Sequence, residues 1–232
     1  MPDFETIYRE HAHEYDRLVA REDHQGNILR ALMELCSLAG VQVVEMGAGT
    51  GRITRLLAPH VRFVAAFDRS KAMLDVAAGR LKETSPRNWR LAAGDNCRLP
   101  VADGVADIVV AGWSLGHSTG WHPDTWPREI EHAIGQMRRA LRPGGAAIIL
   151  ETLGTGRESP QPPTPALAEY YRLLEDRHGF ASKWIRTDYR FESPAEADRL
   201  TRFFFGDELA DRVRREELVV LPECTGLWWA RQ

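Results

Sequence analysis

Short apolar runs alternate with amphipathic segments along most of the chain. Five runs are rich in aliphatic and β-branched residues, a composition that predicts strands buried on both faces. They cover residues 41–46, 61–68, 89–93, 106–111 and 146–151. Between them, apolar residues recur at helical spacing. Strands that alternate with helices predict an α/β fold with a mostly parallel sheet and helices on both faces.

The pattern outside these runs predicts further helices and strands. Aromatic and apolar positions between residues 3 and 20 form one helical stripe, and a second helix is expected at 24–38. Asp124 is expected to cap a helix that ends at the turn 141–145. The other predicted elements are helices at 71–82, 166–178 and 195–215, the last broken near Gly206, and strands at 183–192 and 218–230.

The first apolar run ends in a glycine-rich turn that opens a helix. Gly47, Gly49 and Gly51 can take backbone angles closed to other residues and carry no Cβ, so a ligand can lie against the main chain. The dinucleotide fingerprint has its third glycine where this sequence has Arg52, so NAD fits the turn poorly. A tight strand-helix turn without a ligand is the structural alternative.

A carboxylate ends the second predicted strand. Asp68 follows the first glycine by about twenty residues, the separation at which an acidic residue accepts hydrogen bonds from ribose hydroxyls in strand-helix-strand nucleotide folds. Its two oxygens can accept two hydroxyl donors at once. Asp68 could instead cap the following helix, but Ser70 can supply that cap, which favours the ribose role.

Three motifs together resemble a known family. The run from Glu45 to Gly51 is similar to the first motif of the class I S-adenosylmethionine (SAM) dependent methyltransferases, including the acidic residue two places before the first glycine. Gly94, Asp95 and Asn96 match a second motif after the third strand, and Leu141-Arg142-Pro143-Gly144-Gly145 matches a third before the fifth. The resemblance is closest to the small-molecule branch of ubiquinone and menaquinone methyltransferases.

This resemblance implies a Rossmann-like methyltransferase fold. The sheet is expected to have seven strands, mostly parallel, with the last strand antiparallel at the sheet edge. Residues 1–40 would form an N-terminal helical cap over the site, and residues 41–232 would form the SAM-binding core. Within the core, the segment 154–192 would help to wall the substrate pocket.

The resemblance also implies SAM as cofactor and S-adenosylhomocysteine as product. Asp95 or Asn96 would meet the adenine amino group, and the loop after the fourth strand would face the sulfonium. The residues expected to bind the cofactor are Tyr15, Glu45, Gly47, Ala48, Gly49, Gly51, Arg52, Asp68, Arg69, Met73, Gly94, Asp95, Asn96, Ala111, Gly112 and Trp113.

Candidate chemistry gathers at the loop after the fourth strand and in the N-terminal helices. Trp113 could pack its face on the cationic sulfur, and His117 could remove a proton from an acceptor at neutral pH. Tyr15 could close the site, although an aromatic stripe equally fits simple packing. The expected catalytic residues are His117, Tyr15 and Trp113, and the expected substrate-pocket residues are Tyr8, His117, Trp121, Tyr170 and Tyr171.

The expected reaction is in-line methyl transfer to a small-molecule acceptor. Orientation of the reactants and exclusion of water supply most of the rate enhancement, with roughly several kcal/mol available from proximity. A general base is therefore needed only when the acceptor is protonated and weakly acidic. Two alternatives stay open. One is a SAM-consuming enzyme that cyclises SAM or transfers another alkyl group and releases methylthioadenosine, and the other is a SAM-binding module without catalysis.

Composition narrows the partners. The 232 residues include 30 basic and 33 acidic side chains without a basic block, which argues against nucleic acid. Cys36, Cys97 and Cys224 lack metal-ligand spacing, so no metal site is expected. Three cysteines without a disulfide pattern predict a reduced, cytoplasmic protein. No apolar stretch is long enough to span a bilayer and the polar N-terminus is not a signal peptide, so no membrane partner is expected. The oligomeric state cannot be derived from these features.

Overall fold

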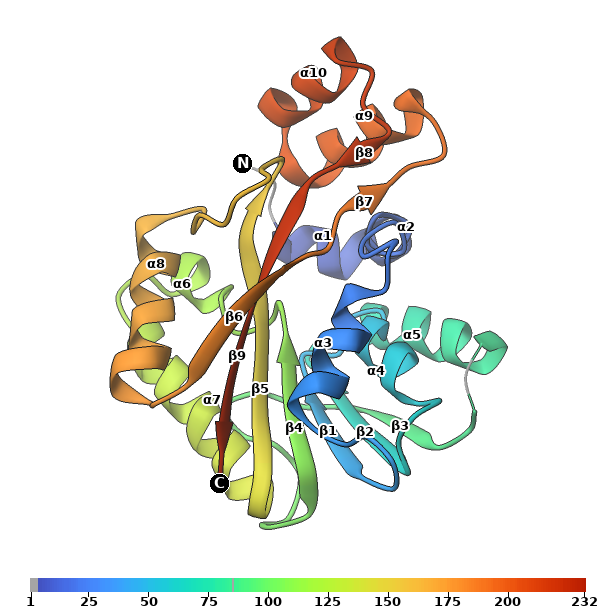
Figure 1. Cartoon of the computed structure of the whole chain (residues 1–232). Helices are drawn as coiled ribbons and strands as arrows, with labels where there is room; N and C mark the ends of the chain where they lie inside the picture. Colours follow the sequence, from blue (N-terminus) through green and yellow to red (C-terminus); the bar gives the residue numbers. More distant parts are fainter. Residues whose placement is uncertain (1–3, 85) are drawn as a thin grey trace.

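A seven-stranded sheet forms the centre of the computed structural model, which describes residues 4–84 and 86–232 (Figure 1). Its strands are β1 (Gln42–Met46), β2 (Phe63–Asp68), β3 (Trp89–Ala93), β4 (Ala106–Gly112), β5 (Leu141–Thr155), β6 (Ala181–Arg186) and β9 (Glu223–Arg231). They lie in the order β3-β2-β1-β4-β5-β9-β6. A separate pair, β7 (Tyr189–Arg190) and β8 (Val220–Leu221), forms a small antiparallel ribbon.

The pairing confirms the expected mostly parallel sheet with an antiparallel last strand. β1 pairs in parallel with β2 and with β4, β2 pairs with β3, and β4 with β5. β9 runs antiparallel to β5. Its expected place at the sheet edge is wrong, because β6 pairs with β9 from Ala181 opposite Trp229 to Arg186 opposite Cys224. β6 is therefore the edge strand, and β9 is buried between two neighbours.

Helices cover both faces of the sheet (Figure 1). One face packs against α3 (Asn27–Leu35) and α4 (Arg52–Leu57), and the other against α7 (Trp126–Ala140) and α8 (Pro165–Arg172). Successive residues of one strand serve opposite faces. In β4, Ile108 and Val110 join the cluster under α3 and α4, whereas Val109 and Ala111 join the cluster under α7.

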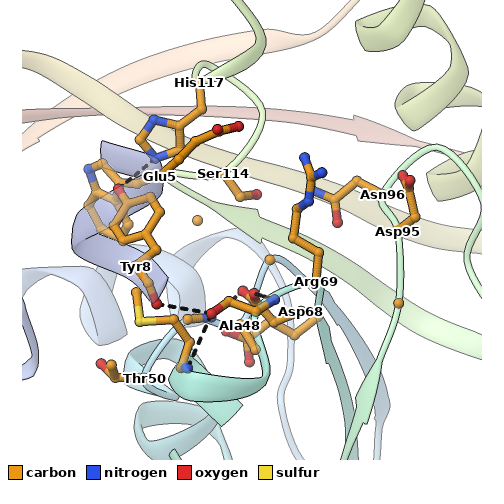
Figure 2. A pocket seen from close by; sticks show the side chains of 18 of the residues that line it. Glu5, Tyr8, Ala48, Thr50, Asp68, Arg69, Asp95, Asn96, Ser114 and His117 are labelled. Carbon is orange, nitrogen blue, oxygen red and sulfur yellow. Dashed lines mark hydrogen bonds between the residues drawn. The ribbon is translucent and has the colours of Figure 1, made fainter. Parts of the chain in front are cut away.

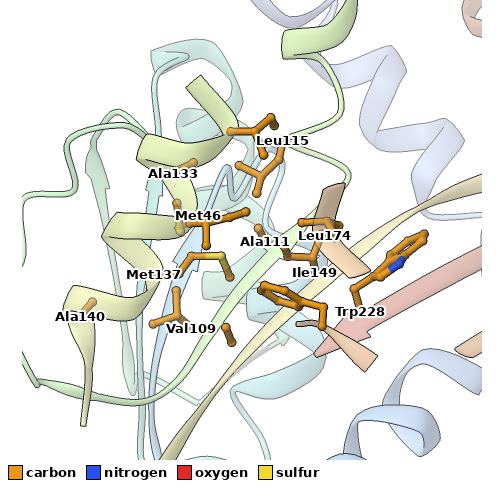
Figure 3. Close-up of a cluster of buried hydrophobic side chains, with 14 of the residues drawn as sticks. Met46, Val109, Ala111, Leu115, Ala133, Met137, Ala140, Ile149, Leu174 and Trp228 are labelled. Carbon is orange, nitrogen blue, oxygen red and sulfur yellow. The ribbon is translucent and has the colours of Figure 1, made fainter. Parts of the chain in front are cut away.

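The cluster under α7 anchors the central strands. Figure 3 shows Met137 and Ala133 of α7 facing Val109 and Ala111 of β4 and Ile149 of β5. Met137 and Ile149 have no exposed surface. Burial of each such large side chain contributes about 1.5–3 kcal/mol. The strand ends that carry the loops are therefore fixed by a tightly packed layer beneath them.

The N-terminal stripe forms two helices instead of the one predicted. α1 (Phe4–Glu10) and α2 (Ala12–Val19) are separated at His11, whose backbone leaves the helical region. Residue 3 lies outside the described residues. The second predicted helix is shorter than expected, because α3 begins after Gly26 (φ +71°). The Asp23 carboxylate accepts hydrogen bonds from the first two amides of α3, at 2.7 and 3.0 Å.

The C-terminal elements lie beyond the carboxyl ends of the parallel strands. α9 (Pro194–Phe205) and α10 (Asp207–Arg215) confirm the predicted break at Gly206. Leu18 of α2 is fully buried in a small cluster with residues of α9, α10, β7 and β8. The remaining helices are α5 (Lys71–Thr84), α6 (Ser118–Trp121) and the π-helix η1 (Leu173–Arg177). The first and last parts of the chain thus share one small core above the sheet (Figure 1).

The turn at 141–145 differs from the prediction. These residues begin β5, with Leu141 paired to Ala106, and a register shift follows before regular pairing resumes at Ile108. Gly144 takes φ +80°, which a glycine adopts at little cost. Irregular pairing therefore takes the place of a turn. Within the described ranges, none of the helices is long and apolar enough to cross a membrane.

Met137→Ala is expected to lower the free energy of unfolding by about 2–5 kcal/mol, because it removes a buried side chain and leaves a cavity. Chemical denaturation followed by circular dichroism measures the change. Met33→Ala is the matched control, since Met33 is 48% exposed on α3, and its effect should stay below about 0.5 kcal/mol. Equal losses in both variants would contradict the packing argument.

Candidate functional site

A cavity of about 800 Å³ opens at the carboxyl ends of β1, β2, β3 and β4. The strand order reverses here, because the chain runs from β1 to β2 on one side and later places β4 on the other side of β1. Open α/β sheets bind ligands at such a switch point. The sheet supplies the floor of the cavity, and α1 lies over it with Tyr8 pointing inward (Figure 2).

The glycine turn between β1 and α4 lines the floor. Gly47 and Gly49 take φ +68° and +54°, in the left-handed region that favours glycine. A Cβ on Gly47 would lie 2.3 Å from the Cβ of Ser114, so only glycine fits beside that loop. Gly51 does not line the cavity and instead packs against Ala77 of α5. The expected cofactor role of Gly51 therefore reduces to shaping the turn.

Asp68 joins the ends of β1 and β2 at the cavity wall. Its Oδ2 accepts a hydrogen bond from the Gly49 amide at 2.8 Å, and its Oδ1 accepts one from the Ser70 amide at 2.8 Å. Burial raises the pKa of Asp68, and the two amide bonds oppose that rise. Each carboxylate oxygen can still accept a second donor. The capping role and the predicted ribose role are therefore compatible.

The expected adenine residues gather on one side of the cavity. Asp95 and Asn96, with Gly94, follow β3, and two further expected cofactor residues lie near them, Arg69 in the β2–α5 connection and Met73 in α5. The Asp95 carboxylate accepts the Cys97 amide at 2.7 Å, which folds this loop into a tight turn. Ala48 and Gly112 also line the cavity. Ala111, another expected cofactor residue, does not, because it faces the cluster under α7.

Two charged residues lie below the glycine turn, Glu45 fully buried and Arg52 with 16% of its side chain exposed. Glu45 is 1% exposed and accepts a hydrogen bond from the Thr54 hydroxyl, and burial raises its pKa to about 8. Arg52 pairs with Glu22, and its guanidinium lies 3.5 Å from the centre of the Trp113 ring. One face of the Trp113 indole is thus covered by a cation of the protein itself. Arg52, Glu45 and Trp113 all line the cavity.

The loop after β4 holds Trp113 in a sparsely populated conformation. Trp113 takes φ +49°, while its amide donates to the Leu150 carbonyl at 2.7 Å. The Ser114 hydroxyl donates to the Met46 carbonyl at 3.0 Å and ties the loop to β1. Non-glycine residues in this region cluster at functional sites. The strained backbone of Trp113 is therefore consistent with the prediction that this loop belongs to the functional site.

His117 lies at the end of the cavity covered by α1. Its Nε2 is 2.9 Å from the Tyr8 hydroxyl (Figure 2). Its ring stacks on Trp121 at 4.8 Å between centroids. Burial lowers the pKa of His117 to about 4, so the ring is neutral at pH 7. The ring also donates to the Trp113 carbonyl. In the neutral ring the other nitrogen is an acceptor, so the Tyr8 hydroxyl donates to Nε2.

Tyr15 lines the cavity beside Tyr8. The two rings meet edge to face at 5.2 Å, and Tyr15 also contacts Phe204 of α9 at 5.4 Å. Burial raises the pKa of Tyr15 to about 12, and the pKa of Tyr8 is raised chiefly for the same reason. Both phenols are therefore protonated at neutral pH. Tyr15 therefore packs in this ring cluster and also lines the cavity, and its role in closing the site stays a prediction.

Tyr170 and Tyr171 do not line the cavity. Both are buried in the cluster under α7 and α8, where Tyr171 stacks on Trp228 at 4.5 Å and donates to the Thr152 carbonyl at 2.7 Å. The helical spacing of apolar residues correctly predicted that one face of α8 is buried. It could not predict which part of the structure that face packs against. None of the described lining residues comes from the segment 154–192. Its Tyr170, Tyr171 and Phe180 pack on the sheet, whereas Tyr189 and Phe191 pack in the small core with Leu18.

Several lining residues were not among the expected site residues. Ser70 and Ser114 lie next to residues that the sequence did mark, and Glu5 and Arg9 come with α1. The others are Val19, Thr50, Ile53, Lys71, Ala72, Cys97, Ser118, His122, Glu129 and His132. Among residues 4–84 and 86–232, no three His, Cys, Asp or Glu side chains come together to hold a metal ion.

Comparison with known proteins finds a methyltransferase domain in the chain. Residues 43–145 match the family model for a methyltransferase domain. Demethylmenaquinone methyltransferase of Staphylococcus aureus (strain MRSA252) is 30% identical over 173 residues, which are 72% of this chain and 64% of that protein. The chain therefore matches just under two thirds of the length of this curated relative.

Solved structures share the fold. A SAM-dependent methyltransferase from Aquifex aeolicus aligns with a TM-score of 0.54 and 14% identity over 86% of this chain and 87% of that one. Phosphoethanolamine N-methyltransferase 2 of Haemonchus contortus, solved with S-adenosyl-L-methionine, aligns with a TM-score of 0.53 and 18% identity over 89% of this chain and 53% of that one.

Residues 43–145 match a methyltransferase domain, and the chain shares its fold with solved methyltransferases. The residues of the site fit SAM, the cofactor that the sequence resemblance implies. Gly49 leaves the floor open, because the nearest side-chain atom, Cε of Met73, is 4.0 Å from where its Cβ would lie, and the Asp68 carboxylate has capacity for further donors. The Thr50 hydroxyl, buried at the cavity wall without a hydrogen-bond partner, is a further group that a ligand could satisfy.

The pKa of His117 predicts a pH-dependent loss of stability. Between about pH 6.5 and 4 the unfolded chain takes up a proton at this ring whereas the folded chain does not, so stability falls as the pH decreases through this window. The contribution is at most about 1.4 kcal/mol per pH unit. Urea denaturation of wild type and His117→Gln across this window measures the difference. Parallel pH profiles would contradict the prediction.

Proposed function

We propose that the chain is an enzyme that transfers a methyl group from SAM to a small-molecule acceptor. One observation carries the proposal. A single cavity runs from the glycine turn and Asp68 to the ring cluster of Tyr8, His117 and Trp121. Cofactor and acceptor can therefore lie in one continuous cavity, as in-line transfer requires. The family match supports the same reaction.

The proposed cofactor half is the polar half of the cavity. Asp68 would accept hydrogen bonds from the ribose, and Asp95 or Asn96 would meet the adenine. The glycine turn would lie against the amino-acid end, with Arg52 nearby as a cation whose charge is balanced by Glu22. When bound, SAM supplies a sulfonium whose methyl carbon is open to in-line attack.

The proposed acceptor half is the aromatic half. Tyr8, His117 and Trp121 form its wall, and α1 lies over it. A neutral imidazole can accept a proton, but its Nε2 already accepts the Tyr8 hydroxyl. An acceptor proton would therefore reach His117 through Tyr8 or after displacing it. Trp113, with one face on Arg52, would wall the passage between the two halves.

The remaining proposals concern the N-terminal cap, the class of acceptor and the cellular location. Residues 1–40 would act as the cap over the site, although only α1 and α2 contribute lining residues and α3 packs on the sheet. The acceptor would be a small molecule rather than nucleic acid, because the chain lacks a basic block. The three cysteines are unpaired, which supports a cytoplasmic location.

Asp68→Ala is expected to weaken SAM binding by about 10- to 100-fold, because hydrogen bonds to a charged group contribute about 1.5–3 kcal/mol. Isothermal titration calorimetry measures the affinity. Asp75→Ala is the control, since Asp75 is exposed on α5 and pairs only with Lys71 in the described contacts. Thermal melting of each variant separates lost binding from lost folding. Unchanged affinity in a folded Asp68→Ala protein would refute the ribose assignment.

Methyl transfer and the alternative reactions differ in their cofactor product. Incubation with SAM and a metabolite extract, followed by mass spectrometry, should yield S-adenosylhomocysteine together with an acceptor heavier by one methylene. Release of methylthioadenosine would instead indicate cyclisation or transfer of another alkyl group. SAM recovered intact, despite binding by calorimetry, would indicate a binding module. Asp68→Ala serves as the control, because it should form the product more slowly at limiting SAM.

A further inference from the structure

Glu151 is a buried carboxyl group that the proposed mechanism does not yet use. It lies near the end of β5 and is 3% exposed. Its Oε1 accepts a hydrogen bond from the Gly116 amide at 2.8 Å, and the carboxyl group also accepts the Leu115 amide. Both amides belong to the loop after β4, immediately before His117. A side chain of the sheet therefore holds the main chain that carries the imidazole.

The fit between Glu151 and this loop is close. A Cβ on Gly116 would lie 2.9 Å from Oε2 of Glu151 and 3.1 Å from Leu167 of α8. Gly116 thus allows the carboxyl group to approach the backbone directly. Burying a carboxyl group is costly unless hydrogen bonds compensate it, and these amides provide that compensation. The contact is specific to this position of the loop.

Glu151 is also within electrostatic reach of the site. Burial is the main reason that the pKa of Tyr8 is raised, and the charges of Tyr15, Asp68 and Glu151 add to the rise. Tyr8 is therefore kept protonated, as it must be to donate to His117 Nε2. Burial raises the pKa of Glu151 itself to about 8, and its bonds to the loop amides oppose that rise.

We propose that Glu151 is a positioning residue for methyl transfer, which fixes the Leu115–Gly116 main chain and thereby sets the His117 ring against Tyr8 and Trp121. The inference rests on the proposed function, because the orientation of His117 matters only if the acceptor binds there. Glu151 touches neither half of the cavity, since it is absent from the lining. Its hydrogen bonds act on His117 through the loop.

Histidine NMR on the folded protein tests the proposal without an acceptor. In wild type, the His117 ring should titrate at about 4. In Glu151→Ala the freed loop should let water reach the ring, so its pKa should rise by about one unit or more toward 6.5. Glu151→Gln should stay near wild type, because its amide oxygen can still accept the Gly116 hydrogen bond.

A matched control separates positioning from general stability. Glu223 is a second buried acid, with its pKa also raised to about 8, and it accepts the Thr152 hydroxyl at 2.7 Å without contacting the loop. Glu223→Ala should cost stability and leave the His117 titration unchanged. If Glu151→Ala does not fold, Gly116→Ala pushes a methyl group toward the same carboxyl group and should produce the same His117 shift.

Enzyme kinetics complete the test. In Glu151→Ala, turnover measured as S-adenosylhomocysteine release should fall about tenfold or more, while the SAM dissociation constant stays within about twofold. In a His117→Ala background, adding Glu151→Ala should not lower turnover further, because both substitutions remove the same placement of the His117 ring. An unchanged His117 titration in folded Glu151→Ala or Gly116→Ala protein would overturn the proposal. Failure of methyl transfer in wild type would instead refute the proposed function and leave the NMR result standing.

Discussion

The hydrogen bond from the Gly49 amide to the Asp68 carboxylate joins the ends of two parallel strands, and the architecture of the site depends on it. It fixes the glycine turn against β2 and leaves the other carboxylate oxygen on Ser70, at the start of α5. Because β4 pairs with β1 on the opposite side, the Trp113 loop meets the same turn. The switch in strand order thus brings three separate loops to one cavity.

Around this floor, aromatic rings supply the cover. Tyr8 and Tyr15 come from the first two helices, and Phe204 of α9 packs against Tyr15. His117 and Trp121 complete the wall from the loop after β4 and from α6. The cover is therefore assembled from both ends of the chain on a sheet formed by its middle. Such a wall excludes water while presenting few fixed charges to an acceptor.

Buried acids run through the structure beneath the site. Glu45, Glu151 and Glu223 each have a pKa raised to about 8 by burial, and each accepts a hydrogen bond from a neighbouring hydroxyl or amide. Groups of this kind reduce stability unless their partners are held in place. Their presence at strand ends fits a scaffold that gives up some stability to fix loop positions. Perturbed groups of this kind cluster at functional sites.

The sequence by itself determined the alternation of strands and helices, the glycine turn and the carboxylate at Asp68, because hydrophobic period, backbone freedom and strand-end position are local properties. Only the tertiary structure decided that Arg52 pairs with Glu22, 30 residues away, and that Tyr8 bonds to His117, 109 residues away. It also placed Tyr171 in the core and β9 inside the sheet. Spacing along a helix or strand defines a buried face, but the partner of that face is set by how the elements pack in three dimensions.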